Sequence, residues 1–349
     1  MYPMRPTSSI HAIKDLFVLN LNSPEMSLVV AVLRESAGLA RRVQQDMAVI
    51  NLTKSDLSPV TVADFAIQAL AAKRLRDVFP DAALVAEENA DRLRDPENAA
   101  MLDVIVGYVA ALIPGANRDK ICAWIDSGAD ASGERFWTLD PIDGTKGYRR
   151  GDQYAVALAL LEEGRVTLGG LACPGLDANC MPAPGGCGAL AIAQRGAGAW
   201  RAPLNDADAP YARMRVSDCA APVKARLLRS FEAGHTNVDQ IEGIAAHLGI
   251  SHDKMARMDS QAKYAALAAG HGELLFRLLS PSRPDYRECI WDHAAGAIIL
   301  EEAGGCVTDL NGKPFDFTRG RKLTENIGLF ASNGLLHDAG LEAIGRVTA

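Results

Sequence analysis

Two aspartates stand close together in the segment 140–145, DPIDGT, which follows a short run of apolar and aromatic residues. Such a run is typical of a strand, and the proline and glycine after it favour a tight turn. In that turn the side chains of Asp140 and Asp143 can converge, together with the carbonyl of Ile142. Ligands that are all oxygen atoms suit a hard cation such as Mg²⁺. The segment is therefore a candidate cation site.

Donors for an anion lie at the end of the same segment. The backbone N–H groups of Gly144 and Thr145 would face a bound anion, and a helix that began there would strengthen this arrangement. An ordinary turn explains the same residues about equally well, because aspartate, proline and glycine are common turn residues. The segment by itself leaves an ion-binding site and a plain turn as alternatives.

Further carboxylates follow or precede other apolar segments. Glu87 and Glu88 come directly after the apolar run 83–86, and Asp292 stands in a Trp-Asp-His triplet before the small residues 294–297. Taken alone, the glutamate pair is typical of a solvated loop, and Asp292 could serve only as a helix N-cap. The small residues indicate that the helix after Asp292 packs closely against another element.

The composition is that of a globular protein, and it limits the classes of partner. The chain has 349 residues, 48% of them hydrophobic and 23% charged, and 36 basic against 43 acidic side chains give a net charge of −7. This balance argues against a general nucleic-acid-binding surface, although a local basic pocket could still hold a small anion. No stretch of about 20 apolar residues predicts a membrane-spanning helix.

The cysteines point to a reduced compartment. There are seven, and no two form a CxxC pair, so a disulfide framework or a zinc ribbon is not expected. We therefore expect the protein in the cytoplasm. The longest apolar stretch near the start, residues 16–19, is too short for the core of a signal peptide. We expect residues 1–25 to form an N-terminal extension.

Apolar periodicity predicts the elements that must position these residues in the first half. A helix is expected from Pro24, which Ser23 would cap, and a second over residues 61–78, with Asp64 in its first turn. The segment 173–188 is rich in proline and glycine and predicts a loop at a domain boundary. We expect further elements here, a helix over 101–112 and strands over 83–86, 136–139, 154–161 and 166–171.

The second half shows the same mixture of elements. Strands are expected around 227–229 and 274–276, and helices over 238–248, 260–269 and 291–302. Strands and helices in both halves predict layered α/β or α+β packing. We expect an N-terminal α+β domain over 26–175, which holds most of the candidate carboxylates, and a C-terminal α/β domain over 176–349, which holds Asp292.

Four motifs, in order along the chain, resemble those of a known enzyme superfamily. DPIDGTKGY (140–148) and WDHAAGAIILEEAGG (291–305) are similar to two signatures of the lithium-sensitive, magnesium-dependent phosphatases, which include inositol monophosphatase. SPVTVAD (58–64) and VAEE (85–88) match the two other acidic positions. The resemblance covers nearly all of residues 26–330.

Within this superfamily the chain most resembles the 3′(2′),5′-bisphosphate nucleotidases. The features that carry this resemblance are Lys146-Gly147, the run RGDQYAVALAL from Arg150, and DSQAKY from Asp259. The implied activity removes the 3′-phosphate of adenosine 3′,5′-bisphosphate to give AMP and phosphate, with 3′-phosphoadenylyl sulfate as a further candidate substrate. The implied fold is the inositol monophosphatase-like sandwich of alternating helix and sheet layers.

The resemblance also implies the roles of individual residues and a cofactor of two or more Mg²⁺ ions. The implied Mg²⁺ ligands are Glu87, Asp140, the Ile142 carbonyl, Asp143 and Asp292. The implied pair that activates the attacking water is Asp64 and Thr145. The implied substrate contacts are Gly144, Thr145, His235, Ser260, Lys263 and Arg277. Simpler roles stay open for two of them, since His235 could cap the helix that follows it and Lys263 could be solvated.

Two other functions remain as alternatives. An inositol phosphatase of the same superfamily is disfavoured by Lys146-Gly147 and by DSQAKY. A non-catalytic nucleotide-binding protein is disfavoured because every expected carboxylate is present. We expect a small phosphorylated nucleotide as the partner, no nucleic acid or membrane, and a monomer rather than a homodimer.

Overall fold

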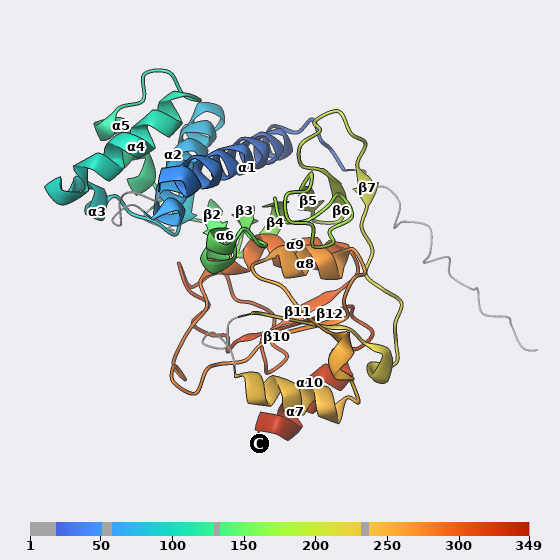
Figure 1. Ribbon diagram of the computed structural model, residues 1–349. Coiled ribbons are helices and arrows are strands. Elements are labelled where there is room, and N and C mark those ends of the chain that lie inside the picture. Colours follow the sequence, from blue (N-terminus) through green and yellow to red (C-terminus); the bar gives the residue numbers. More distant parts are fainter. Residues whose placement is uncertain (1–18, 51–57, 129–132, 232–236, 349) are drawn as a thin grey trace, which may run out of the picture.

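The computed structural model describes residues 19–50, 58–128, 133–231 and 237–348. Within them, layers of helix and sheet alternate from one end of the molecule to the other (Figure 1). The helices of the first half are α1 (Pro24–Ile50), α2 (Pro59–Val78), α3 (Asp91–Arg94), α4 (Ala99–Ala110), α5 (Arg118–Asp126) and α6 (Thr145–Arg150). Those of the second half are α7 (Val238–His247), α8 (Ala262–Ala268), α9 (Ala294–Glu302) and α10 (His337–Thr348).

The strands form two sheets. The seven-stranded sheet runs in the order β1 (Ala83–Ala86), β2 (Arg135–Asp143), β3 (Ala155–Glu162), β4 (Arg165–Cys173), β5 (Ala189–Gln194), β6 (Gly198–Pro203) and β7 (Ala212–Arg213). The five-stranded sheet runs in the order β11 (Cys306–Thr308), β12 (Leu329–Ser332), β10 (Leu274–Arg277), β8 (Leu227–Arg229) and β9 (Met255–Arg257). In the first sheet only β1 and β2 pair in parallel among the described strands.

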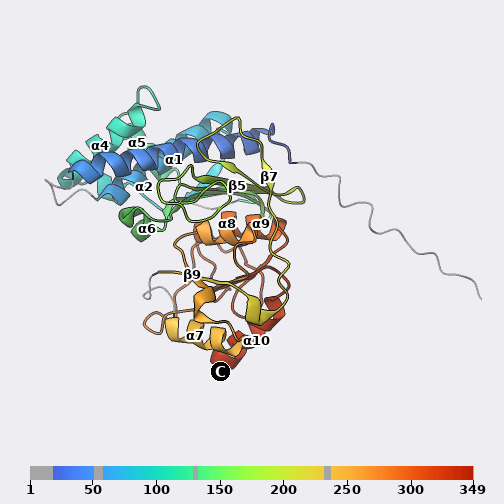
Figure 2. The same ribbon diagram turned by 45° about the vertical axis from the view of Figure 1, so that its right-hand side comes forward.

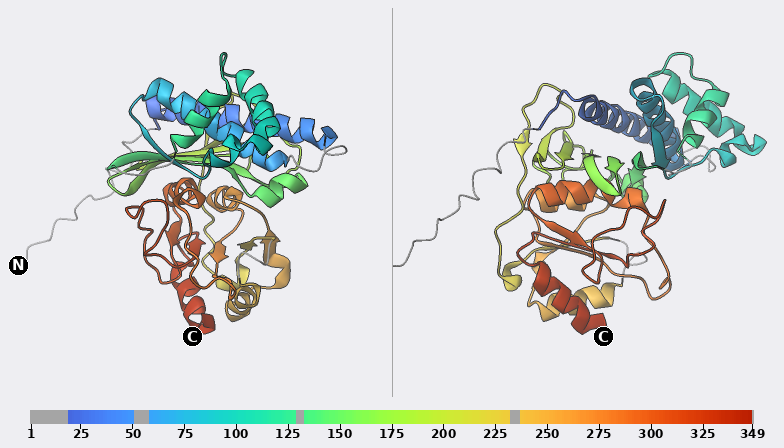
Figure 3. Two further views of the ribbon diagram at one scale, coloured as in Figure 1. Left: turned by 90° about the vertical axis from the view of Figure 1, so that its left-hand side faces the viewer. Right: turned by 180° about the vertical axis from the view of Figure 1, so that it is seen from behind.

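Each sheet has helices on both faces. α1 and α2 cover one face of the first sheet, and α8 and α9 lie between its other face and the second sheet (Figures 1 and 2). α7 and α10 close the far face of the second sheet (Figure 3). This arrangement confirms the predicted sandwich of alternating helix and sheet layers. None of the described helices is long and apolar enough to cross a membrane.

Local sequence accounts for where these helices begin and pack. Oγ of Ser23 accepts a hydrogen bond from the N–H of Met26 at 3.2 Å, which confirms the predicted cap of α1. α9 is buried all round over residues 294–300, as expected for a helix enclosed between two sheets. A Cβ atom on Gly169 of β4 would stand 2.6 Å from Cγ2 of Ile298, so the glycine permits close contact with α9. The predicted close packing of this helix is confirmed.

The first sheet continues beyond the predicted domain boundary between residues 175 and 176. β5 pairs with β4 across the loop that follows Cys173, and β6 and β7 extend the same sheet to Arg213. The division between the two sheets therefore lies after β7. β5 is rich in alanine and β6 carries only one large apolar side chain, so hydrophobic patterning predicts neither strand. The loop before them is rich in proline and glycine, and it therefore predicts a boundary there.

Several predicted helix bounds also need correction. α2 begins at Pro59, so Asp64 lies in its second turn and not in its first. The segment 91–126 holds three helices where one was predicted, because α3 and α5 are too short to show a clear period. α8 and α9 begin later than predicted, and a 3-10 turn over Ile290–Asp292 precedes α9.

Candidate active site

A cleft of about 350 Å³ lies where the end of β2 and the start of α6 meet the second sheet, α8 and the turn before α9. Its lining brings together most of the predicted site residues, namely Glu87, Asp140, Ile142, Asp143, Gly144, Thr145, Ser260, Lys263, Arg277 and Asp292. Asp64 is buried beside this cleft and does not line it. His235 lies outside the residues that the structure describes.

An irregularity in β2 accounts for the convergence of its two aspartates. The register of β2 against β3 shifts between Asp140 and Asp143, which is the signature of a β-bulge. A bulge re-aims side chains that would otherwise alternate between the two faces of a sheet. As a result Asp140, Ile142 and Asp143 all line the cleft.

The acidic wall of the cleft consists of Glu87, Asp140, Asp143 and Asp292. Burial is the largest cause that raises the pKa of Asp140, followed by repulsion from Glu87 and the other acids. Although Glu87 has much exposed surface, it stands in a concave site, where desolvation and then repulsion from Asp292 raise its pKa to about 8. For Asp292 desolvation raises the pKa to about 6, against the opposing effect of Arg277. These like charges are destabilising unless a cation joins them.

Unpartnered carboxylate oxygens, one in the acidic wall and one beside it, show that the site fits a cation. Oδ1 of Asp140 and Oδ1 of Asp64 are buried and have no hydrogen-bond partner among the described residues. Leaving a buried carboxylate oxygen without a partner is costly, and a hard cation takes such oxygens as ligands. The donor set and the orphaned oxygens therefore suit Mg²⁺.

Asp64 and Thr145 stand on two helices that contact each other, α2 and α6. Burial, followed by repulsion from Glu87 and Glu88, raises the pKa of Asp64 well above its usual value. Thr145 is exposed to the cleft. The pair is near the acidic wall, and its role in activating water stays a prediction.

The turn after β2 needs glycine for two independent reasons. Gly144 has φ +85°, and a Cβ there would lie 2.8 Å from Cβ of Ser260. Ser260 itself has φ +62°, a left-handed conformation that is unusual for serine and often occurs at functional sites. The two residues bring the start of α6 into direct contact with the start of α8. An ion pair between Arg150 and Asp259 fastens the same two elements.

The basic wall of the cleft consists of Lys263, Arg277 and Arg283. Desolvation lowers the pKa of Lys263 to about 8, although Asp143 and Asp259 favour its charged form. The guanidinium carbons of Arg277 and Arg283 lie 5.8 and 5.2 Å from the ring centre of Tyr286. The cleft therefore has cationic groups facing a set of carboxylates.

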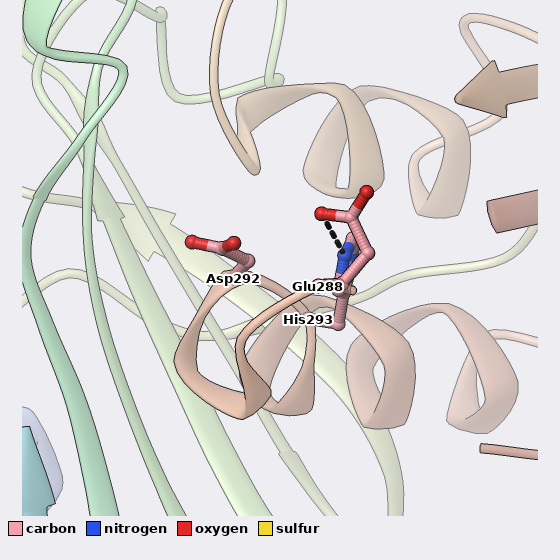
Figure 4. Close-up of side chains that lie close together, drawn as sticks. All are labelled: Glu288, Asp292 and His293. Carbon is pink, nitrogen blue, oxygen red and sulfur yellow. Dashed lines mark hydrogen bonds and ion pairs between the residues drawn. The ribbon is translucent and has the colours of Figure 1, made fainter. Parts of the chain in front are cut away.

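A buried network orients Arg277 from behind. Its Nε lies 3.0 Å from Oε1 of Glu288, and Oε2 of Glu288 lies 3.3 Å from Nε2 of His293. The other ring nitrogen of His293 shares a hydrogen bond of 3.0 Å with the hydroxyl of Tyr264. Donor atoms of Glu288, Asp292 and His293 come within 4.8 Å of one another, but Figure 4 shows the Asp292 carboxylate pointing away from the other two. This group is better explained as support for Arg277 than as a metal site.

Gln261 connects both sides of the site, and the sequence analysis missed it. Its backbone N–H donates to Oδ2 of Asp143 at 2.5 Å, its side-chain nitrogen donates to the carbonyl of Trp291, and its side-chain oxygen accepts from the N–H of Gly296. The only available signal was its place in DSQAKY. Arg283, Tyr286 and Glu288 were also missed, because they lie in a polar, proline-containing segment without periodicity.

Related proteins of known sequence share most of the chain. A 3′(2′),5′-bisphosphate nucleotidase of Schizosaccharomyces pombe is 37% identical over 344 residues, which cover 93% of this chain and 96% of the relative. The protein of the same name from Oryza sativa is 40% identical over 328 residues, which cover 88% and 90% of the two chains.

Solved structures of inositol monophosphatases share the fold. The one from Anabaena gives a TM-score of 0.59 at 21% identity, covering 92% of this chain and 94% of that chain. The Thermotoga maritima enzyme gives 0.60 at 21% identity, covering 93% and 98%. The sequence model of the inositol monophosphatase family matches residues 22–348. The chain therefore belongs to the inositol monophosphatase family.

Proposed function

We propose that the protein is a magnesium-dependent phosphatase that removes the 3′-phosphate of adenosine 3′,5′-bisphosphate, giving AMP and phosphate. The names of the relatives from S. pombe and O. sativa support this reaction. The sulfated nucleotide 3′-phosphoadenylyl sulfate, which carries the same 3′-phosphate, is a second candidate substrate of the same site.

The observation that carries this proposal is the pairing of an acidic and a basic wall within one cleft. A phosphate cannot approach four carboxylates unless a cation neutralises them, so the acidic wall suits the phosphate that is cleaved. A second phosphate needs direct cationic partners, and Lys263 and Arg277 offer them. A substrate with two phosphates matches both walls.

The residues that would hold Mg²⁺ are Glu87, Asp140, Asp143, Asp292 and the carbonyl of Ile142, and we expect two or more ions. When bound, Mg²⁺ supplies positive charge that acidifies the attacking water and offsets negative charge on the phosphate oxygens. The chain contributes the fixed frame, because the bulge in β2 and the 3-10 turn before α9 set the ligand positions in advance.

The remaining residues act on the water and the substrate directly. The hydroxyl of Thr145 takes the proton of the attacking water and passes its own proton to the carboxylate of Asp64. The N–H groups of Gly144 and Thr145 bind oxygens of the phosphate that is cleaved. Ser260 contacts the nucleotide between the two walls, Lys263 and Arg277 bind its second phosphate, and His235 contacts the adenine ring.

Phosphate release from a set of substrates tests this proposal. With Mg²⁺ present, adenosine 3′,5′-bisphosphate and 3′-phosphoadenylyl sulfate should both be cleaved with far higher kcat/KM than inositol 1-phosphate. A preference for inositol 1-phosphate would reject the substrate and leave a phosphatase of the inositol type. Binding of the nucleotide without phosphate release would indicate a non-catalytic protein.

A further inference from the structure

The end of β1, at Ala86 and Glu87, and the turn before α9 each contribute one carboxylate to the acidic wall. One arginine contacts both of these segments. We propose that Arg321 is a positioning residue that holds Glu87 and Asp292 at the spacing required for cation binding. The inference rests on the proposed function, since it assumes that these two carboxylates share a cation site. Arg321 belongs to the segment between β11 and β12 of the second sheet.

The guanidinium of Arg321 holds the end of β1. Its Nη2 donates to the carbonyl of Ala86 at 2.7 Å and to the carbonyl of Glu87 at 3.4 Å. Its Nη1 donates to the carbonyl of Gly128 at 3.2 Å, which also accepts from the N–H of Ala86. The fork of the guanidinium thus fixes the backbone on which the side chain of Glu87 is mounted.

On its other side, the end of β1 is held by α2. Nε2 of Gln68 donates to the carbonyl of Glu88 at 2.7 Å, and Oε1 of Gln68 accepts from the N–H of Glu88 at 2.9 Å. Gln68 belongs to the first half of the chain, whereas Arg321 reaches Ala86 from 235 residues away in sequence. The contact of Arg321 therefore fixes the end of β1 relative to the second half of the chain.

The same arginine also holds the turn that carries Asp292. Its guanidinium carbon lies 4.6 Å from the ring centre of Trp291, a cation–π distance. Its carbonyl accepts from the N–H of Ile290 at 3.1 Å, and the next residue, Lys322, forms a β-bridge with Cys289. Backbone and side chain of Arg321 therefore both contact the segment directly before Asp292.

This double contact matters because the two carboxylates repel each other. Glu87 and Asp292 line the same cleft, and both are negatively charged when ionised. Without a cation the two segments are driven apart, and each must be held by contacts away from its charged group. Residues that orient ligands in this way typically change metal affinity or activity about 10–100-fold when they are replaced.

The test measures Mg²⁺ binding by calorimetry on the full-length protein without substrate, for wild type, R321A, R321K and R319A. Arg319 is the matched control, because it lies in the same segment and pairs with Asp316 on the surface. We expect R321A to bind Mg²⁺ about tenfold or more weakly and R319A to bind it like wild type. R321K should fall between them, because one ammonium group cannot reproduce the fork and the ring contact together.

A structural role alone would give a different result. It would lower the melting temperature of R321A while the folded protein kept its Mg²⁺ affinity, and that outcome would overturn the proposal. If R321A does not fold, R321K decides, and an affinity equal to that of R319A would overturn the proposal as well. A wild type that binds Mg²⁺ but releases no phosphate from adenosine 3′,5′-bisphosphate contradicts the proposed function and leaves the result on Arg321 valid.

Discussion

Two of the four carboxylates of the acidic wall come from one irregular strand end, whereas each residue of the basic wall comes from a different element of the second half. Asp140 and Asp143 stand on the bulge of β2 inside the first sheet. Lys263, Arg277 and Arg283 come from α8, from β10 and from the segment after it. A sheet holds ligands rigidly, and variable elements around it suit recognition of a particular substrate.

The two walls also differ in electrostatic balance. Burial is the largest cause that raises the pKa values of Asp140, Asp143 and Asp292, and repulsion from Glu87 and the other acids raises that of Asp140 further. On the basic wall Arg277 has a buried partner in Glu288. The acidic wall therefore depends on an added cation, whereas on the basic wall the protein already supplies an acidic partner for Arg277.

The largest effect should follow from breaking the acidic wall. Asp143→Asn keeps the shape of the side chain but removes charge that holds Mg²⁺. We expect kcat/KM to fall by well over about 100-fold, which is more than the usual effect of replacing a residue that only orients a metal ligand. A chelator should abolish the activity of wild type. Phosphate release measured with and without chelator checks both results, and full activity in either case would contradict the cation site.

Removal of the Thr145 hydroxyl should come next. Thr145→Ala leaves the backbone donors in place but takes away a proton acceptor, which typically costs ~10²–10⁴-fold in rate. The loss should appear in kcat, because the proton moves in the transition state. Steady-state kinetics separates this from a simple phosphate contact, for which KM would rise and kcat would stay constant.

A smaller and more selective effect is expected on the basic wall. A hydrogen bond to a charged group contributes about 1.5–3 kcal/mol, so Lys263→Ala should raise KM for adenosine 3′,5′-bisphosphate about tenfold or more. Hydrolysis of inositol 1-phosphate, which has no second phosphate, should hardly change. Lys120→Ala, at an exposed position on α5, is the control. Equal losses on both substrates would show that Lys263 does not distinguish them.

The smallest effect should be a difference in stability. A ligand at 100 times its dissociation constant stabilises the folded state by about 2.7 kcal/mol, so Mg²⁺ should raise the melting temperature of wild type by a few degrees. Asp143→Asn should show little of this increase, and Lys263→Ala should keep it. Thermal unfolding with and without Mg²⁺ measures the difference. An equal increase of the melting temperature in all three proteins would show that stabilisation by Mg²⁺ does not depend on the acidic wall.

The same contrast explains how much the sequence could predict. Asp140 and Asp143 are close together in the chain, so their segment marks a candidate cation site, although by itself it leaves a plain turn as an alternative. Gln261 and Arg321 have importance only through contacts with residues far away in sequence, and no local pattern marks such contacts. Layered packing was predicted because both halves mix helices and strands, and the sandwich of alternating layers was implied by the family resemblance.

Elements with a weak hydrophobic pattern were not predicted. β5 alternates alanine with Leu190 and Ile192, and β6 has a single tryptophan, so neither shows the apolar and polar alternation of a half-buried strand. Their pairing with β4 depends on tertiary packing, and the predicted domain boundary consequently fell inside the first sheet. Short helices such as α5 were missed because fewer than three turns give little periodicity.

The central claim is that the two walls bind two phosphates of one substrate. It is tested most directly by comparing kcat/KM for adenosine 3′,5′-bisphosphate and adenosine 3′-monophosphate, which differ only in the 5′-phosphate, in wild type and in Lys263→Ala. We predict that wild type prefers the bisphosphate about tenfold or more and that the substitution removes most of this preference. Equal kcat/KM values for the two nucleotides in wild type would contradict the claim.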